Sequence, residues 1–183
     1  MDAIGLCETT SIAIGHQAED EMLKAAEVQL LLARSICPGK YLVVVGGEVS
    51  SVRAAVDAGA QTASHSLVEN RVIARVHEKV FPAISCAVEL EAKDVKALGI
   101  VETFSASSII DCADAAVKAS EVVLFRVHLA MAVGGKGFFM VTGEVAAVEA
   151  AIAAGAQMAA EEGILVGQVV IPGPRPELFR EVI

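Results

Sequence analysis

The sequence contains the same segment twice. Residues 3–11 align with residues 97–105, which lie 94 positions later. After two extra residues in the second copy the spacing becomes 96, and residues 58–61 align without a mismatch with residues 154–157. A repeat of this length is a whole domain, not a unit of a solenoid. We therefore predict two tandem domains with one fold, over 1–93 and 94–183.

Each copy has the same order of hydrophobic patterns. In the first copy, alternating or aliphatic runs predict four strands, and helical spacing of apolar residues predicts two helices, the second capped by Ser50 or Ser51. The predicted ranges are strand 3–9, helix 16–27, strand 28–36, strand 41–45 and strand 68–76. The second helix precedes the last strand and has Val52, Val56 and Ala60 along one face. This β-α-β-β-α-β order predicts an α+β fold of the ferredoxin-like type, with both helices on one face of an antiparallel sheet.

The composition limits the classes of function. Hydrophobic residues make up 55% of the chain, yet no uninterrupted apolar stretch reaches the ~18 residues of a membrane span. We therefore expect no contact with a membrane, no secretory signal in residues 1–5, and apolar surface that is buried between subunits. The net charge of −9 leaves no basic stripe, so binding to nucleic acid is not expected.

The cysteines do not form a disulfide framework. Cys7, Cys37, Cys86 and Cys112 are scattered and no CxxC occurs, which favours a reducing cytoplasm over a secreted scaffold. Within one chain, no two of them have the spacing of metal ligands. We expect Cys7 in a core strand, Cys112 on a helix and Cys86 in an accessible linker.

Several phrases resemble the shell domains of bacterial microcompartments. The matching segments are residues 5–9, 21–28, 47–52 and 55–59 in the first copy, and 99–103, 114–122, 143–147 and 169–172 in the second. Residues 35–40, 82–85 and 126–130 are also similar to tandem-domain shell proteins of propanediol-utilisation compartments. The resemblance implies that three chains form a pseudo-hexameric tile. It also implies that tiles pack edge to edge, with other shell proteins, around encapsulated redox enzymes in the cytoplasm.

In that family the turn between the second and third strands faces the central pore of the tile. The resemblance therefore assigns the pore loop to Ile36, Pro38, Gly39, Ala132, Val133, Gly134 and Gly135. Three copies of Cys37 would meet on the threefold axis, and three thiolates suit a [4Fe–4S] cluster that leaves one iron to a non-protein ligand. The resemblance implies one such oxygen-sensitive cluster per trimer. Arg34 and Lys40 are expected to favour the thiolate.

Lys24 and Lys118 occupy the position that lies along the tile edge in this family. On sequence alone each is a solvated helix residue, and the match in both copies favours the edge assignment. The sequence departs from the family pattern at Glu27 and Glu121, where many members have Asn. It also departs at residues 172–176, which lack the usual Pro-Arg-Pro-His phrase.

The sequence is compatible with other functions as well. Cys37 is also compatible with a plain metabolite pore that binds no metal, because free cysteine is commonly a small packing residue. A regulatory trimer that binds small molecules between its subunits is a third hypothesis. An enzyme is the weakest hypothesis, because no arrangement of nucleophile and base is found. The leading hypothesis is a shell protein whose pore cluster passes electrons across the shell.

Overall fold

The computed structural model describes residues 1–91 and 95–179, which form two compact units. Of these residues, Met1–Phe81 and Ala130–Gly135 form the first unit, and the remaining described residues form the second. The loop 130–135 therefore groups with the first copy, although the sequence places it in the second. The predicted boundary between residues 93 and 94 lies outside the described residues.

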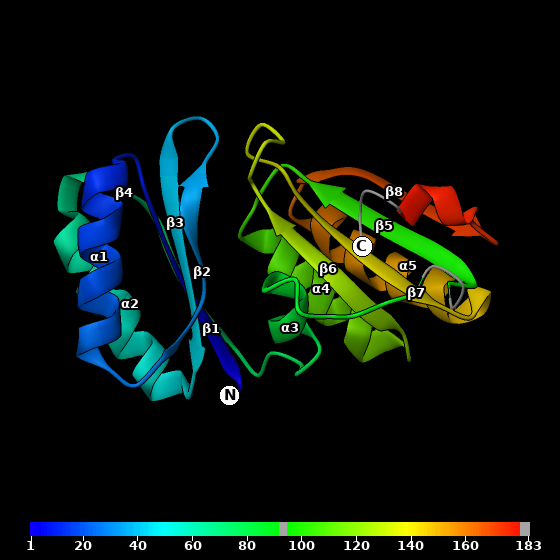
Figure 1. The fold of residues 1–183 in the computed structure, drawn as a ribbon, viewed down its shortest axis with the longest axis horizontal. Helices are drawn as coiled ribbons and strands as arrows, with labels where there is room; N and C mark the ends of the chain where they lie inside the picture. The colour runs from blue at the N-terminus through cyan, green and yellow to red at the C-terminus, as the bar shows by residue number, and fades with distance from the viewer. Residues whose placement is uncertain (92–94, 180–183) are drawn as a thin grey trace. The chain divides into compact units, whose positions relative to one another are not determined.

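The first unit has the predicted order of elements. Its sheet has the antiparallel strand order β2-β3-β1-β4, and α1 and α2 cover one face of it (Figure 1). The elements are β1 Ala3–Thr9, α1 Ile12–Ala25, β2 Gln29–Ile36, β3 Lys40–Gly47, α2 Val49–Ala63 and β4 Leu67–Ala74. The short helix α3 Val80–Ile84 follows, with its first two residues in the first unit and the rest in the second.

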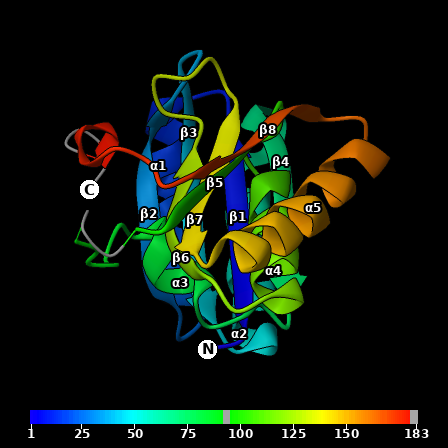
Figure 2. The same cartoon turned by 90° about the vertical axis from the view of Figure 1, so that its right-hand side faces the viewer.

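The second unit repeats this topology with the strand order β6-β7-β5-β8, and α4 and α5 pack together on its sheet (Figure 2). Its elements are β5 Ala97–Thr103, α4 Ser108–Ala119, β6 Val123–Leu129, β7 Gly137–Gly143, α5 Val145–Glu161 and β8 Leu165–Pro172. The predicted α+β architecture is confirmed in both copies. Among the described residues, no helix is both long enough and apolar enough to span a membrane.

Both helices of the first unit differ from the prediction in their boundaries, and α1 ends at Ala25 instead of residue 27. The helix α1 begins at Ile12, because the hydroxyl of Ser11 accepts a hydrogen bond from the amide of Ile14 and caps it there. The predicted cap of α2 at Ser50 or Ser51 is wrong, since the helix begins at Val49 as soon as β3 ends at Gly47. The cap residue is Glu48, whose side chain makes no capping bond.

The core of the first unit lies between its sheet and its two helices. Cys7 and Val43 face Met22 and Val56 across this layer. Alternate strand residues on the opposite face, such as Leu42, are buried as well. Burial of both faces explains why the strands have continuous aliphatic runs instead of strict alternation with polar residues.

The two copies fill one core position in opposite ways. A Cβ atom on Gly15 of α1 would lie 2.5 Å from the Cβ of Tyr41 on β3. In the second unit the large residue is on the helix, since a Cβ on Gly137 of β7 would lie 2.8 Å from the Cγ2 of Ile109 on α4. Each glycine thus makes room for the bulky residue that faces it.

Candidate functional site

The first predicted pore turn joins β2 to β3. Residues 37–39 form the turn, and Ile36 pairs with Lys40 at its base. The Cys37 side chain is half-buried and its thiol is free, whereas Pro38 and Gly39 are exposed. Gly39 has φ = 76°, which only glycine adopts without strain, and no heavy atom lies within 4 Å of the position its Cβ would take. The turn therefore has open space beside Gly39.

The second predicted pore turn lies against the first. The Cys37 amide donates to the Ala130 carbonyl at 3.5 Å, and a Cβ on Gly135 would lie 3.7 Å from the Cys37 carbonyl oxygen. Arg34 Nη1 lies 3.6 Å from Met131 Sδ. These contacts bring together two segments that are more than 90 positions apart in the chain. The predicted pore residues of the second turn, Ala132, Val133 and Gly134, are half-exposed or exposed on the same loop.

Each pore turn is followed by a lysine that pairs with a glutamate on the central strand. Lys40 Nζ lies 2.6 Å from Glu8 Oε1, and Lys136 Nζ lies 2.6 Å from Glu102 Oε1. Lys40 was expected from the sequence to favour the Cys37 thiolate, whereas in the structure its ammonium group pairs with Glu8. The matched glutamate and lysine in both copies were the signal that could have revealed the pairs.

The other three cysteines lie elsewhere. Cys7 and Cys112 are buried and Cys86 is exposed, as predicted. Burial, and then the neighbouring Glu8 carboxylate, raise the pKa of the Cys7 thiol to about 11, so Cys7 stays protonated near neutral pH. Across residues 1–91 and 95–179, no three His, Cys, Asp or Glu side chains of one chain gather closely enough to hold a metal ion.

A polar cluster beside the first turn has no equivalent in the second copy. The Tyr41 hydroxyl donates to Glu19 Oε2 at 3.0 Å and lies 3.1 Å from His16 Nδ1. Burial, and then Glu19, raise the pKa of Tyr41 to about 12, so the stability that the protonated phenol contributes is lost as the pH rises from about 10 to about 12. The matched positions in the second copy are Ile110, Ala113 and Gly137. Comparison of the copies could have revealed this cluster.

The two predicted edge lysines occupy equivalent places. Lys24 and Lys118 lie in the last turns of α1 and α4, with side chains that are 63% and 46% exposed. Each forms an ion pair with an aspartate one turn earlier, Asp20 or Asp114. Their aliphatic stems and ammonium groups are therefore accessible from outside the unit.

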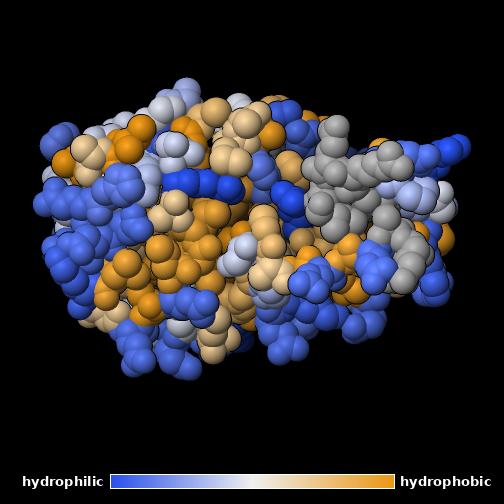
Figure 3. Space-filling model, viewed as in Figure 1, coloured by the Kyte–Doolittle hydropathy of each residue, from blue (hydrophilic) through white to orange (hydrophobic). Residues whose placement is uncertain are grey.

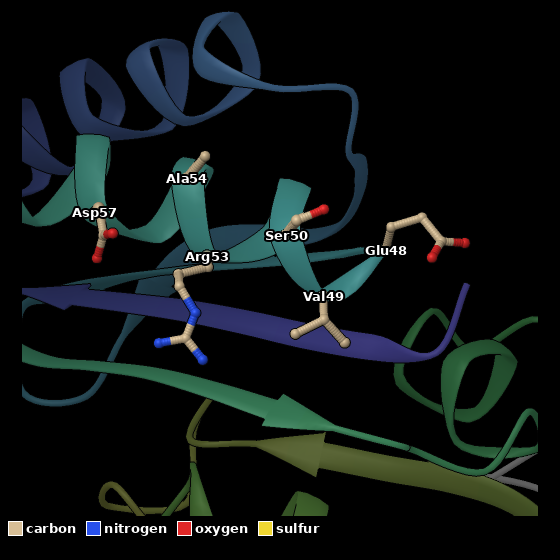
Figure 4. Close-up of a pocket in the computed structure, with 6 residues that line it drawn as sticks. All are labelled: Glu48, Val49, Ser50, Arg53, Ala54 and Asp57. Carbon is tan, nitrogen blue, oxygen red and sulfur yellow. The ribbon is translucent and has the colours of Figure 1, made fainter.

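A separate surface depression of about 600 Å³ lies at the start of α2 (Figure 4). Glu48, Arg53 and Asp57 supply its charged groups, and Val49, Ser50 and Ala54 complete the lining. Its lining includes none of the predicted pore or edge residues and no cysteine, so it is separate from the predicted pore turns.

Comparison with known proteins relates this geometry to a family. The family model described as the BMC domain matches residues 3–76 and again residues 97–174. The chain belongs to the BMC-domain family. It is 44% identical over 181 residues to the bacterial microcompartment shell protein PduT of Citrobacter freundii, and the match covers 99% of this chain and 97% of PduT.

Two further relatives define the length and the fold of the BMC domain. The carboxysome shell protein CsoS1 of Prochlorococcus marinus is 39% identical over 95 residues, which is 50% of this chain and 92% of CsoS1. One relative of single-copy length thus corresponds to half of this chain. The crystal structure of a microcompartment protein from Desulfitobacterium hafniense has a TM-score of 0.94 and 48% identity, covering 98% of this chain and 99% of that one. This chain is a structural shell protein of the BMC family, similar to PduT.

Proposed function

We propose that three copies of this BMC protein form a pseudo-hexameric tile of a microcompartment shell, and that the three Cys37 turns bind one [4Fe–4S] cluster in its pore. The proposal rests on the contact between the two turns of one chain, in which the Cys37 amide donates to the Ala130 carbonyl. The Cys37 thiol on the first of these turns is free and half-buried. When bound, the cluster would supply one-electron transfer between the two sides of the shell, serving encapsulated redox enzymes.

The residues around Cys37 fit such a group. The thiol is half-exposed, and Gly39 leaves the space beside the turn open. The facing loop contributes two small exposed residues, Ala132 and Gly134. One chain supplies a single thiolate, so the cluster needs the threefold axis to gather its three protein ligands.

Assembly into a tile is supported by exposed apolar side chains. On the face shown in Figure 3, such side chains gather over β2 and the adjoining part of α1. Leu23 and Leu30 belong to these elements and are 40% and 39% exposed. Exposed apolar surface of this kind usually marks an interface with another protein chain.

The purified protein is therefore expected to be a trimer that tends to form larger sheets. Light scattering at micromolar concentration should give three times the mass of the 18.9 kDa chain as the smallest stable species. A stable monomer would contradict the proposal. Stoichiometric binding of a small molecule between subunits, without any formation of sheets, would favour the regulatory hypothesis instead.

The double variant Lys24→Ala and Lys118→Ala is expected to remain trimeric but to form sheets poorly. An exposed lysine contact contributes only about 0.2–1 kcal/mol, but the contact repeats at every edge of every tile. Electron microscopy should show a rise in the protein concentration needed for sheets by about tenfold. A matched control is Lys79→Ala, which removes a lysine outside the two repeated helix ends. Equal sheet formation by the double variant and the parent would show that the edge assignment is wrong.

A further inference from the structure

Both copies place an ionised pair beside the pore turn, although the turns themselves have diverged. Glu8 and Glu102 occupy matched positions on β1 and β5, and Lys40 and Lys136 follow the two turns. We propose that Glu8 is a positioning residue, whose carboxylate anchors Lys40 and thereby holds the Cys37 turn in one conformation. Glu102 does the same for the second turn through Lys136.

The surroundings of Glu8 show that the pair is more than an incidental surface contact. Glu8 is 8% exposed, and its neighbours on the same face of the sheet are the buried Leu6 and Leu42. An ionised carboxylate in such a place is costly unless a cation compensates it, and the Lys40 ammonium at 2.6 Å is that cation. The fold therefore requires Lys40 to reach toward β1.

Lys40 lies at the base of the Cys37 turn, so its ion pair with Glu8 also restrains the turn. Lys40 is the first residue of β3 and pairs with Ile36, so it closes the base of the segment that carries Cys37. An anchor at this base limits the conformations of the turn without touching the thiol. The role of this turn in the pore rests on the proposed function, whereas the anchoring itself rests only on the contacts within the chain.

The two pairs differ in burial, which makes them a matched comparison. The side chains of Lys40 and Glu8 are 32% and 10% exposed, whereas those of Lys136 and Glu102 are 36% and 34% exposed. Loss of one partner of a buried pair is more damaging than loss of one partner of an exposed pair. The cysteine-bearing turn should therefore depend more strongly on its anchor than the second turn does.

Hydrogen exchange of the metal-free trimer, followed by mass spectrometry, tests the anchor. Glu8→Gln and Lys40→Met should each speed exchange of peptides that span residues 36–41 by about tenfold, because either change removes the same contact. The double variant should exchange no faster than the faster single variant. Lys40→Arg should keep the exchange of the parent, and Glu102→Gln should act mainly on peptides that span residues 134–138, with a smaller increase.

Asp20→Asn is the control, since it removes a carboxylate from the exposed Lys24 pair without touching the turn. The inference is overturned if Glu8→Gln and Lys40→Met leave residues 36–41 unchanged, or if they speed exchange uniformly along the chain. If Glu8→Gln does not fold, Lys40→Met and Lys40→Arg still decide between these outcomes. Absence of iron from the anaerobic protein would refute the proposed cluster and leave the exchange result standing.

Discussion

The variant Cys37→Ser is expected to bind no iron–sulfur cluster. In the trimer one substitution replaces all three soft thiolates by hydroxyl groups, which ionise far less readily and bind iron–sulfur clusters poorly. Iron per trimer should fall from about four to below about 0.4, together with the brown absorbance. The fold and the trimer should survive, because the turn at residues 37–39 lies outside the buried core.

The other cysteines provide matched controls for this variant. Cys86→Ser and Cys112→Ser should keep both iron and absorbance, because Cys86 lies outside the pore turn and Cys112 is buried in α4. Cys7→Ser should also keep the cluster, at a cost in stability of about 1–3 kcal/mol if its buried hydroxyl lacks a partner. Unchanged iron content in Cys37→Ser would show that the cluster, if present, has other ligands.

The second large effect, on thermal stability, is expected from a substitution at Gly15, which faces Tyr41 in the core of the first unit. Gly15→Ile places a side chain where the Cβ alone would lie 2.5 Å from the Cβ of Tyr41, so the helix and the strand must move apart. Overpacking of this severity costs roughly 3 kcal/mol or more, which lowers the melting temperature by about 6–12 °C in a chain of this size. Circular dichroism during thermal unfolding measures this effect.

The second copy suggests how to relieve this clash. Adding Tyr41→Gly to Gly15→Ile reproduces the pair Ile109 and Gly137, so at least half of the lost melting temperature should return. Tyr41→Gly alone is the control, and it should be destabilising because it leaves a cavity and breaks the bond to Glu19. If the double variant is as unstable as the sum of the two single variants, the two copies do not fill this position by a simple exchange.

The fold could be predicted because its signals are local and occur twice. The apolar residues of β1 and β3, and of their counterparts β5 and β7, indicate strands, and the shared order of elements defines the topology. The start of α1 was missed because a single hydrogen bond from the Ile14 amide to the Ser11 hydroxyl decides it. Apolar spacing, on which the prediction relied, does not report such a cap.

The candidate site was only partly predictable. Cys37 was identified through a resemblance, since a lone cysteine in a turn carries no ligand spacing of its own. The contact between Cys37 and Ala130 depends on tertiary packing of distant segments, which no local pattern records. The same holds for Lys40 and Glu8, because the register of β3 against β1 decides that these residues share a face.

The most direct test of the pore assignment is the iron and sulfide content of the protein purified without oxygen, measured together with its paramagnetic resonance spectrum. About four irons and four sulfides per trimer are expected, together with a paramagnetic signal that appears or disappears on one-electron reduction or oxidation. The same preparation from Cys37→Ser should contain neither. Anaerobic trimers that assemble into sheets but contain no iron would contradict the cluster and would instead support a plain metabolite pore.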